Sequence, residues 1–341
     1  MQRKSGIKKF FIDRLLPIVL VVAAITALIP KSLDQRIDDS IAKAKIFLAD
    51  QNLDQDILGE YYPACLQNAS KCPFDNETFL YKRIDASLDF VFLKDESFNV
   101  SQLEKKVDDS DIFLKNIVKT LPNISIDYSY IDSSRRRGDF ALDLYCILGW
   151  TYNDTAIYRI IRNELKPYGW TNPNTTNFFR KVIDETWCIS LLAENGEDYK
   201  IVKEQVDLKK REFYDFINGS EYLDRKILAG THILLMFSRL KSYGYDISQY
   251  SDFIKPIEYY IIDATSHGKL NFPLEVYHNV LYSLIKARYE DKEFLQELTE
   301  KILQMQNKDG SWVVSADNRF RILVTLRSAI AINLFKTTYL K

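Results

Sequence analysis

Four side chains have the residue types that acid–base chemistry needs and lie in helix-like runs. Asp143 lies in "FALDLYCILGW" and Asp184 in "KVIDETWCISLL", both otherwise largely apolar. Glu275 and His278, in "PLEVYHNV", are three residues apart and would share one face of a helix. A carboxylate in a cavity could bind or protonate a ligand, and a carboxylate beside an imidazole could act as a general acid and base. These four residues are therefore candidate catalytic residues, although each could equally form a structural ion pair or hydrogen bond.

Other chemistry has little support in the sequence. The chain holds only three histidines and no second Glu-x-x-His, so a two-metal carboxylate site is not expected. A zinc site built from Asp184, Cys188 and a distant histidine would have no defining spacing, and we predict neither a metal nor a cofactor. There is no Gly-rich phosphate loop and no nucleophile elbow. With a net charge of -1 and dispersed basic residues, a nucleic-acid partner is not expected.

Helices are expected to position these residues. The chain of 341 residues contains only 11 glycines and 9 prolines, which favours helices over a large sheet. A first amphipathic helix is expected within residues 32–52, and from Phe140 onward apolar periodic blocks alternate with turn signals. The later helices are predicted near residues 140–149, 154–166, 175–193, 198–217, 222–242, 248–265, 273–287, 291–306 and 319–338. Such a series packs as hairpins that either close into a ring or extend as an open α-solenoid.

The stretch "LQMQNKDGSW", Leu303–Trp312, favours the ring. Gln306, Gly310 and Trp312 stand at the spacing of the QW motif, and the sequence resembles the α/α-toroid superfamily of terpenoid cyclases and protein prenyltransferase β-subunits. In that family the glutamine ties exposed backbone groups at a helix end and the tryptophan covers a Gly-containing turn. The resemblance implies an all-α, α/α-toroid domain, and it transfers no catalytic residues.

The N-terminus has a different character from the rest of the chain. A basic flank precedes the apolar residues 15–30, which as a helix would span about 24 Å of a roughly 30 Å hydrocarbon core. We predict a cytoplasmic tail and signal anchor over residues 1–31, which binds the bilayer through residues 15–30, and an extracytoplasmic domain over residues 32–341. The alternative is a cleaved signal peptide with cleavage near Ala27, which would yield a secreted protein.

Sequons and cysteines agree with export. Seven Asn-x-Ser/Thr sequons are candidate glycosylation sites: Asn68, Asn76, Asn99, Asn123, Asn153, Asn174 and Asn218. Cys65 and Cys72 bracket a short loop in an irregular insert at about residues 53–78, where a local disulfide is expected. Cys146 and Cys188 lie in helix-like runs and either pair across two packed helices or remain buried thiols.

Two functions remain open at this point. In one, a membrane-anchored helical barrel binds a glycan or an envelope protein in its concave mouth. In the other, the same barrel is a glycan hydrolase or lyase that uses carboxylates in its cavity. Because no acid–base group stands out by spacing, the binding function is the leading expectation.

Overall fold

A computed structural model describes most of the chain beyond the N-terminal segment. No helix among these residues is long and apolar enough to cross a membrane. The predicted anchor, residues 15–30, lies outside the described part, as do Cys65 and Cys72. The described ranges are 31–53, 76–96, 98–123, 125–127, 139–165, 178–197, 199–220, 222–266, 272–313 and 318–340.

The described chain is helical apart from one small pair of strands, which confirms the all-α prediction. Strands β1 (Ser125–Asp127) and β2 (Asp139–Ala141) pair in parallel, with Ser125 opposite Asp139. The first helix and those from residue 140 on begin and end within a few residues of the predicted blocks, whereas the two helices between residues 76 and 120 lie outside those blocks. They are α3 (Leu33–Asp50), α6 (Asn76–Asp95), α7 (Glu104–Thr120), α8 (Leu142–Thr151), α9 (Thr155–Leu165), α10 (Phe178–Glu194), α11 (Tyr199–Asn218), α12 (Leu223–Ser242), α13 (Ser251–Thr265), α14 (Leu274–Lys286), α15 (Lys292–Gln304) and α16 (Asn318–Tyr339).

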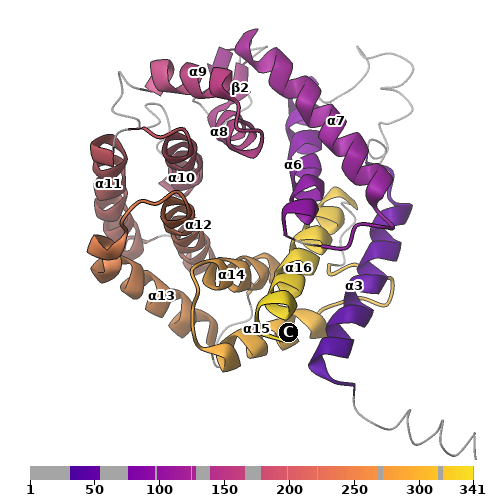
Figure 1. Ribbon diagram of the computed structural model, residues 1–341. Coiled ribbons are helices and arrows are strands. Elements are labelled where there is room, and N and C mark those ends of the chain that lie inside the picture. Colours follow the sequence, from indigo (N-terminus) through magenta and orange to yellow (C-terminus); the bar gives the residue numbers. More distant parts are fainter. Residues whose placement is uncertain are drawn as a thin grey trace, which may run out of the picture.

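These helices alternate between two layers (Figure 1). The inner layer packs in series, with α8 on α10, α10 on α12, α12 on α14, α14 on α16 and α16 on α6. The step from α6 back to α8 is bridged by Phe92 and Trp150, whose ring centroids are 6.2 Å apart. The outer layer follows the same order, because α7, α9, α11, α13, α15 and α3 each pack against an inner helix. Each inner helix therefore touches two inner neighbours.

Helix α3 shows how the local sequence produces these elements. Ser32 caps its start, since the Ser32 hydroxyl accepts from the Gln35 amide and the Gln35 side chain accepts from the Ser32 amide. One stripe of α3 is buried, including Ile37 and Leu48, both fully inaccessible. Burial of one such side chain contributes about 1.5–3 kcal/mol, so the stripe holds α3 against α16 and α15.

The turn after α15 joins the end of the chain to α3. Gln306 donates from Nε2 to the backbone oxygens of Ser40, at 2.9 Å, and Gly310, at 3.1 Å. The Ser40 hydroxyl donates back to Gln306 Oε1 at 2.6 Å. Gly310 has a φ of +91°, and a Cβ atom there would lie 2.3 Å from the carbonyl oxygen of Lys43 in α3. Trp312 is buried and donates from Nε1 to the Ile302 oxygen at 2.7 Å.

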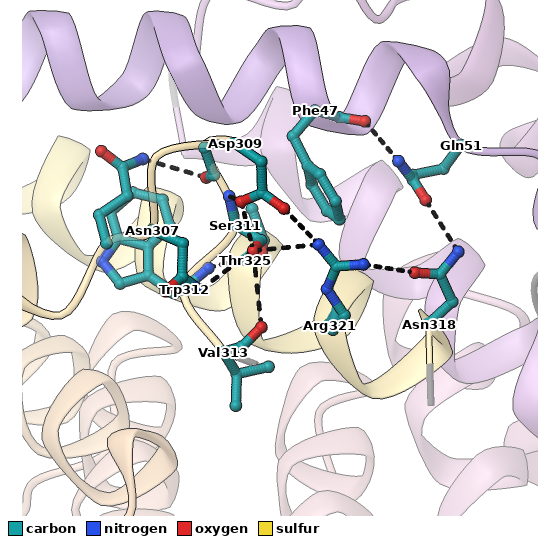
Figure 2. A network of polar contacts seen from close by, with 12 residues as sticks. Phe47, Gln51, Asn307, Asp309, Ser311, Trp312, Val313, Asn318, Arg321 and Thr325 are labelled. Carbon is teal, nitrogen blue, oxygen red and sulfur yellow. Dashed lines mark hydrogen bonds and ion pairs between the residues drawn. The ribbon is translucent and has the colours of Figure 1, made fainter. Parts of the chain in front are cut away.

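Around this turn, polar side chains form a dense network (Figure 2). Arg321 of α16 donates to the side chains of Asp309, Ser311 and Asn318. Its guanidinium carbon also lies 5.0 Å from the centre of the Phe47 ring of α3. We term the region formed by Gln306, Asp309–Trp312, Arg321 and their partners in α3 the closing turn. Its polar groups are used to hold the last helical hairpin against α3.

Candidate functional site

The four residues that the sequence proposed for catalysis lie on three inner helices, and the structure describes the side chains of two of them. His278 is buried and its Nδ1 lies 3.2 Å from the Ser328 hydroxyl of α16. The Glu275 side chain is partly exposed and forms no hydrogen bond with His278 or with any other described residue. Asp143 lies in α8 and Asp184 in α10, but their side chains lie outside the described part. The catalytic role of these four residues therefore stays a prediction.

The disulfide between α8 and α10 brings two tryptophans together. Cys146 and Cys188 are bonded, which decides between the two interpretations of these cysteines and excludes Cys188 as a zinc ligand. Trp150 follows Cys146 by four residues, one helical turn, and Trp187 precedes Cys188 directly. Their ring centroids are 5.2 Å apart at 57°. The covalent link therefore fixes the helices whose tryptophans form an aromatic wall.

Arg239 of α12 stacks on this wall. Its guanidinium carbon lies 3.6 Å from the centre of the Trp187 ring and 4.8 Å from that of Trp150. Such cation–π contacts stabilise by about 0.5–2 kcal/mol and leave the N–H groups in the guanidinium plane free to donate. The one hydrogen bond of the Arg239 guanidinium to a described residue runs from Nη1 to the Ser190 hydroxyl and is long, at 3.4 Å. Burial lowers the pKa of Arg239 to about 10, so it remains a cation at neutral pH.

A tyrosine and a glutamate complete the group. Trp150 donates from Nε1 to the Tyr243 hydroxyl at 2.5 Å, and that hydroxyl donates to Glu194 Oε1 at 3.3 Å. The other oxygen of Glu194, Oε2, is buried without a hydrogen-bond partner. Burial raises the pKa of Glu194, against the opposing effects of Tyr243 and Arg239. One carboxylate oxygen is therefore uncompensated beside the aromatic wall.

These residues face the middle of the ring of helices. Helices α8 and α12 both pack on α10, one on each side. Trp150 of α8 nevertheless contacts Arg239 and Tyr243 of α12. On their other side, α8, α10 and α12 are covered by the outer helices α9, α11 and α13, so we place this contact on the side toward the centre of the ring in Figure 1. We term Trp150, Trp187, Glu194, Arg239 and Tyr243 the central cluster.

Comparison with known proteins assigns no identity to this arrangement. The chain matches no protein-family model, no curated protein and no solved structure. The chemistry of the site must therefore be argued from its own residues.

A second group on the inner helices is fully paired. Glu96, just beyond the end of α6, accepts from the Tyr282 hydroxyl at 2.6 Å and from Lys286 Nζ at 2.7 Å. Both partners belong to α14, which is separated from α6 by α16, so this contact also lies on the central side. The ends of α6 and α14 thus meet at the same end of the ring. Lys286 is neutralised by its own carboxylate.

Two aspartates lie on the same face of α6 as Phe92, the residue that contacts Trp150. Asp85, Asp89 and Phe92 follow one another at four and three residues, the spacing of one helix face. Arg327 of α16 donates from Nε to Asp89 at 2.8 Å and from Nη2 to Asp85 at 3.1 Å. Burial raises the pKa of Asp89 to about 7, and Arg327 only partly opposes this effect. Asp89 can therefore exchange a proton near neutral pH, a property that general acids need.

His278 lies close to this pair but is uncharged. Burial, assisted by the nearby positive charge of Arg327, lowers the pKa of His278 to about 3. Its Nε2 is buried without a hydrogen-bond partner. In the described ranges no three His, Cys, Asp or Glu side chains are grouped to hold a metal ion. His278 is thus a buried neutral imidazole with one unsatisfied nitrogen.

One cavity of about 410 Å³ lies away from these groups, between the end of α3 and the start of α7. Arg83, Lys105 and Lys106 contribute its positive charge. These side chains already have structural roles, since Lys106 donates to the Gln51 oxygen and Arg83 donates to the Ser87 hydroxyl. The cavity also adjoins Leu53, where the described chain stops. We therefore assign no function to this cavity.

Sequence inspection missed the central cluster. The runs that contain Trp150 and Trp187 drew attention only through their cysteines and acids. Arg239 stands in "LLMFSRLKS" as one of many dispersed cations, with no motif around it. The available signal was a cysteine beside or one turn from a tryptophan in two apolar helices, which only a disulfide between them makes meaningful.

Proposed function

We propose that this chain is an extracytoplasmic α/α toroid whose central cluster binds a glycan. The toroid is supported by the two alternating layers and by the closing turn, in which Gln306 joins the end of α15 to Ser40 of α3. This joint has the role that the QW resemblance implies. An open solenoid would leave its first and last hairpins without such a contact.

Export is supported by features of the described domain. The Cys146–Cys188 disulfide is typical of an oxidising compartment. Three of the sequon asparagines, Asn99, Asn153 and Asn218, are exposed, as glycosylation requires. The anchor over residues 15–30 stays a prediction from the sequence, and so does cleavage near Ala27 as its alternative.

One observation carries the assignment of glycan binding: the stack of Arg239 on Trp150 and Trp187 at the centre of the ring. The apolar C–H faces of a sugar ring pack on aromatic faces, while its hydroxyls need donors and acceptors around the edge. Trp187 is largely buried by its neighbours. Trp150, Tyr243 and Glu194 are partly exposed and supply an aromatic face together with hydrogen-bonding groups. The cluster is assembled on rigid helices and a disulfide, so little ordering free energy is lost on binding.

The experiment is a glycan array probed with the full-length chain in detergent, followed by calorimetry on the glycans that bind. Trp150→Leu and Tyr243→Phe should weaken binding at least tenfold, since the first removes a partly exposed aromatic surface and the second a hydrogen-bonding group from the cluster. Tyr259→Ala is the matched control, because Tyr259 is 72% exposed on the outer helix α13. Absence of any bound glycan, or equal losses in all three variants, would show that the proposal is wrong.

Catalysis is the second candidate, and one observation favours it. Asp89 has a pKa of about 7 and adjoins Asp85, so the two could serve as acid and base on a bound glycan. The same glycans should then be cleaved during incubation, with products seen by mass spectrometry and lost in Asp89→Asn. Intact glycans after prolonged incubation would leave binding as the function.

A further inference from the structure

We infer that Arg239 is an anion-binding group, and that the glycan bound by the central cluster carries a carboxylate, as uronic-acid sugars do. This inference rests on the proposed function and specifies its ligand class. Arg239 differs in its partners from two other cations of the inner helices, Lys286 and Arg327. Lys286 is paired with Glu96, and Arg327 is paired with Asp89 and Asp85. Arg239 forms no ion pair with a described carboxylate, although it is no less enclosed.

The orientation of Arg239 determines what it can still bind. Trp187 covers one face of the guanidinium, and that contact uses no N–H group. The Ser190 hydroxyl accepts one long hydrogen bond, and none of the remaining guanidinium nitrogens is both fully buried and without a partner. The free N–H groups are therefore not fully enclosed by the protein. Two parallel N–H groups match the two oxygens of a carboxylate.

Glu194, a described acid close enough to Arg239 to oppose the lowering of its pKa by burial, does not fill this position. Glu194 directs one oxygen to Tyr243 and forms no ion pair with Arg239. Its pKa is raised by burial, so its proton is retained to a higher pH than that of an exposed glutamate. A half-buried guanidinium with no anionic partner is costly unless something else supplies the charge. A ligand carboxylate would supply it while its sugar ring lies along the aromatic wall.

The arginine–tryptophan stack also distinguishes an acidic from a neutral sugar. A neutral glycan would offer hydroxyls, which form weaker hydrogen bonds with a guanidinium than a carboxylate does. A free carboxylate without a sugar would leave Trp150 and Tyr243 uncovered. The site therefore favours a ligand that carries both features in adjacent positions.

The test uses matched pairs of oligosaccharides on the full-length chain in detergent. Oligomers of glucuronic, galacturonic and mannuronic acid are each compared with the carboxyl-reduced oligomer of glucose, galactose or mannose. At least one acidic oligomer should bind, and its neutral counterpart should bind at least tenfold more weakly. Arg239→Met should reduce the affinity for the acid to that for the neutral oligomer, and Arg239→Lys should retain part of the preference.

The control and the outcomes separate this inference from the proposed function. Lys210→Met is the matched control, because Lys210 pairs with Asp252 on the outer helices, and it should keep the full preference. Equal affinity for acidic and neutral oligomers would overturn the carboxylate assignment and leave glycan binding intact, as would preference for sulfated neutral sugars. If no oligomer binds and the array is also blank, the proposed function is wrong as well. Circular dichroism of each variant shows that lost binding does not reflect unfolding.

Discussion

Arg321 and Arg239 both stack on aromatic rings, yet their surroundings differ. In the closing turn, Arg321 lies over Phe47 and also donates to Asp309, Ser311 and Asn318 (Figure 2). In the central cluster, Arg239 lies closer to its aromatic ring, 3.6 Å from Trp187, but has only one long hydrogen bond to a described residue. An arginine that stacks on an aromatic ring thus has three hydrogen-bond acceptors in one region and a single distant one in the other.

The difference indicates where the molecule is built for stability and where it is open to a ligand. Buried polar groups without partners cost free energy, so a fold that needed only stability would pair or remove them. The closing turn satisfies its polar groups. The central helices leave Glu194 Oε2, His278 Nε2 and part of Arg239 without partners. Glu194 and Arg239 lie near each other on rigid helices, and unsatisfied groups in such a cluster are typical of functional sites.

The largest effect should come from breaking the closing turn at Gly310. Gly310→Ala introduces strain at a φ of +91° and places a Cβ atom 2.3 Å from the Lys43 oxygen, so α3 must move. We expect a loss of about 4 kcal/mol of unfolding free energy, measured by denaturant titration. Gly244→Ala is the control, since Gly244 has a φ of +86° but nothing within 4 Å of the added atom. It should cost only about 1–2 kcal/mol. Equal losses would mean that the contact with α3 is unimportant.

An intermediate effect concerns the unsatisfied His278. Because its pKa is about 3 in the fold and near 6.5 unfolded, the unfolded chain binds the extra proton between these values. Above about pH 6.5 His278 therefore costs the fold no stability. As the pH falls below that value, protonation of His278 in the unfolded chain lowers the free energy of unfolding. Relative to the wild type, His278→Gln should gain about 2 kcal/mol between pH 6.5 and 5.

To test His278, the unfolding free energies of the wild type and of His278→Gln are measured across this pH range and subtracted. The subtraction is needed because Asp89 changes the stability in the opposite direction. With a folded pKa of about 7, Asp89 makes the protein more stable as the pH falls from about 7 to 4. Asp89 is present in both proteins, so its contribution cancels in the difference. If the two stability curves run parallel from pH 6.5 to 5, His278 is not held neutral by the fold.

The smallest effect tests the comparison most directly, through the same substitution in both regions. Arg321→Met should cost about 1 kcal/mol of stability, because it removes the ion pair with the half-exposed Asp309 and the donor to Asn318 Oδ1. Arg239→Met should change stability by less than about 0.5 kcal/mol, since it removes a desolvated cation and retains apolar contact with Trp187. Thermal unfolding of the wild type and both variants measures these two stability changes. A larger loss for Arg239→Met would mean that its stack is structural.

How far sequence alone could go is clear from particular residues. The stripe in α3 and the boundaries of α8 to α16 follow from periodicity, because burial of one helix face is a local property of the chain. The spacing of Gln306, Gly310 and Trp312 predicted a tied and covered turn, but not its partner. Ser40, which receives the Gln306 side chain, is 266 residues away. Nothing local to either segment records that contact.

By itself, the sequence determined the helices, their order and the all-α class, since these depend on interactions within a few turns of the chain. Only the tertiary structure decided which side chains meet at the centre. Trp150 and Tyr243 are 93 residues apart and come from helices that are not direct neighbours, so their contact depends on how the intervening α10 packs. Small changes in the angles between helices would redirect these side chains, and those angles are set by packing summed over the whole ring.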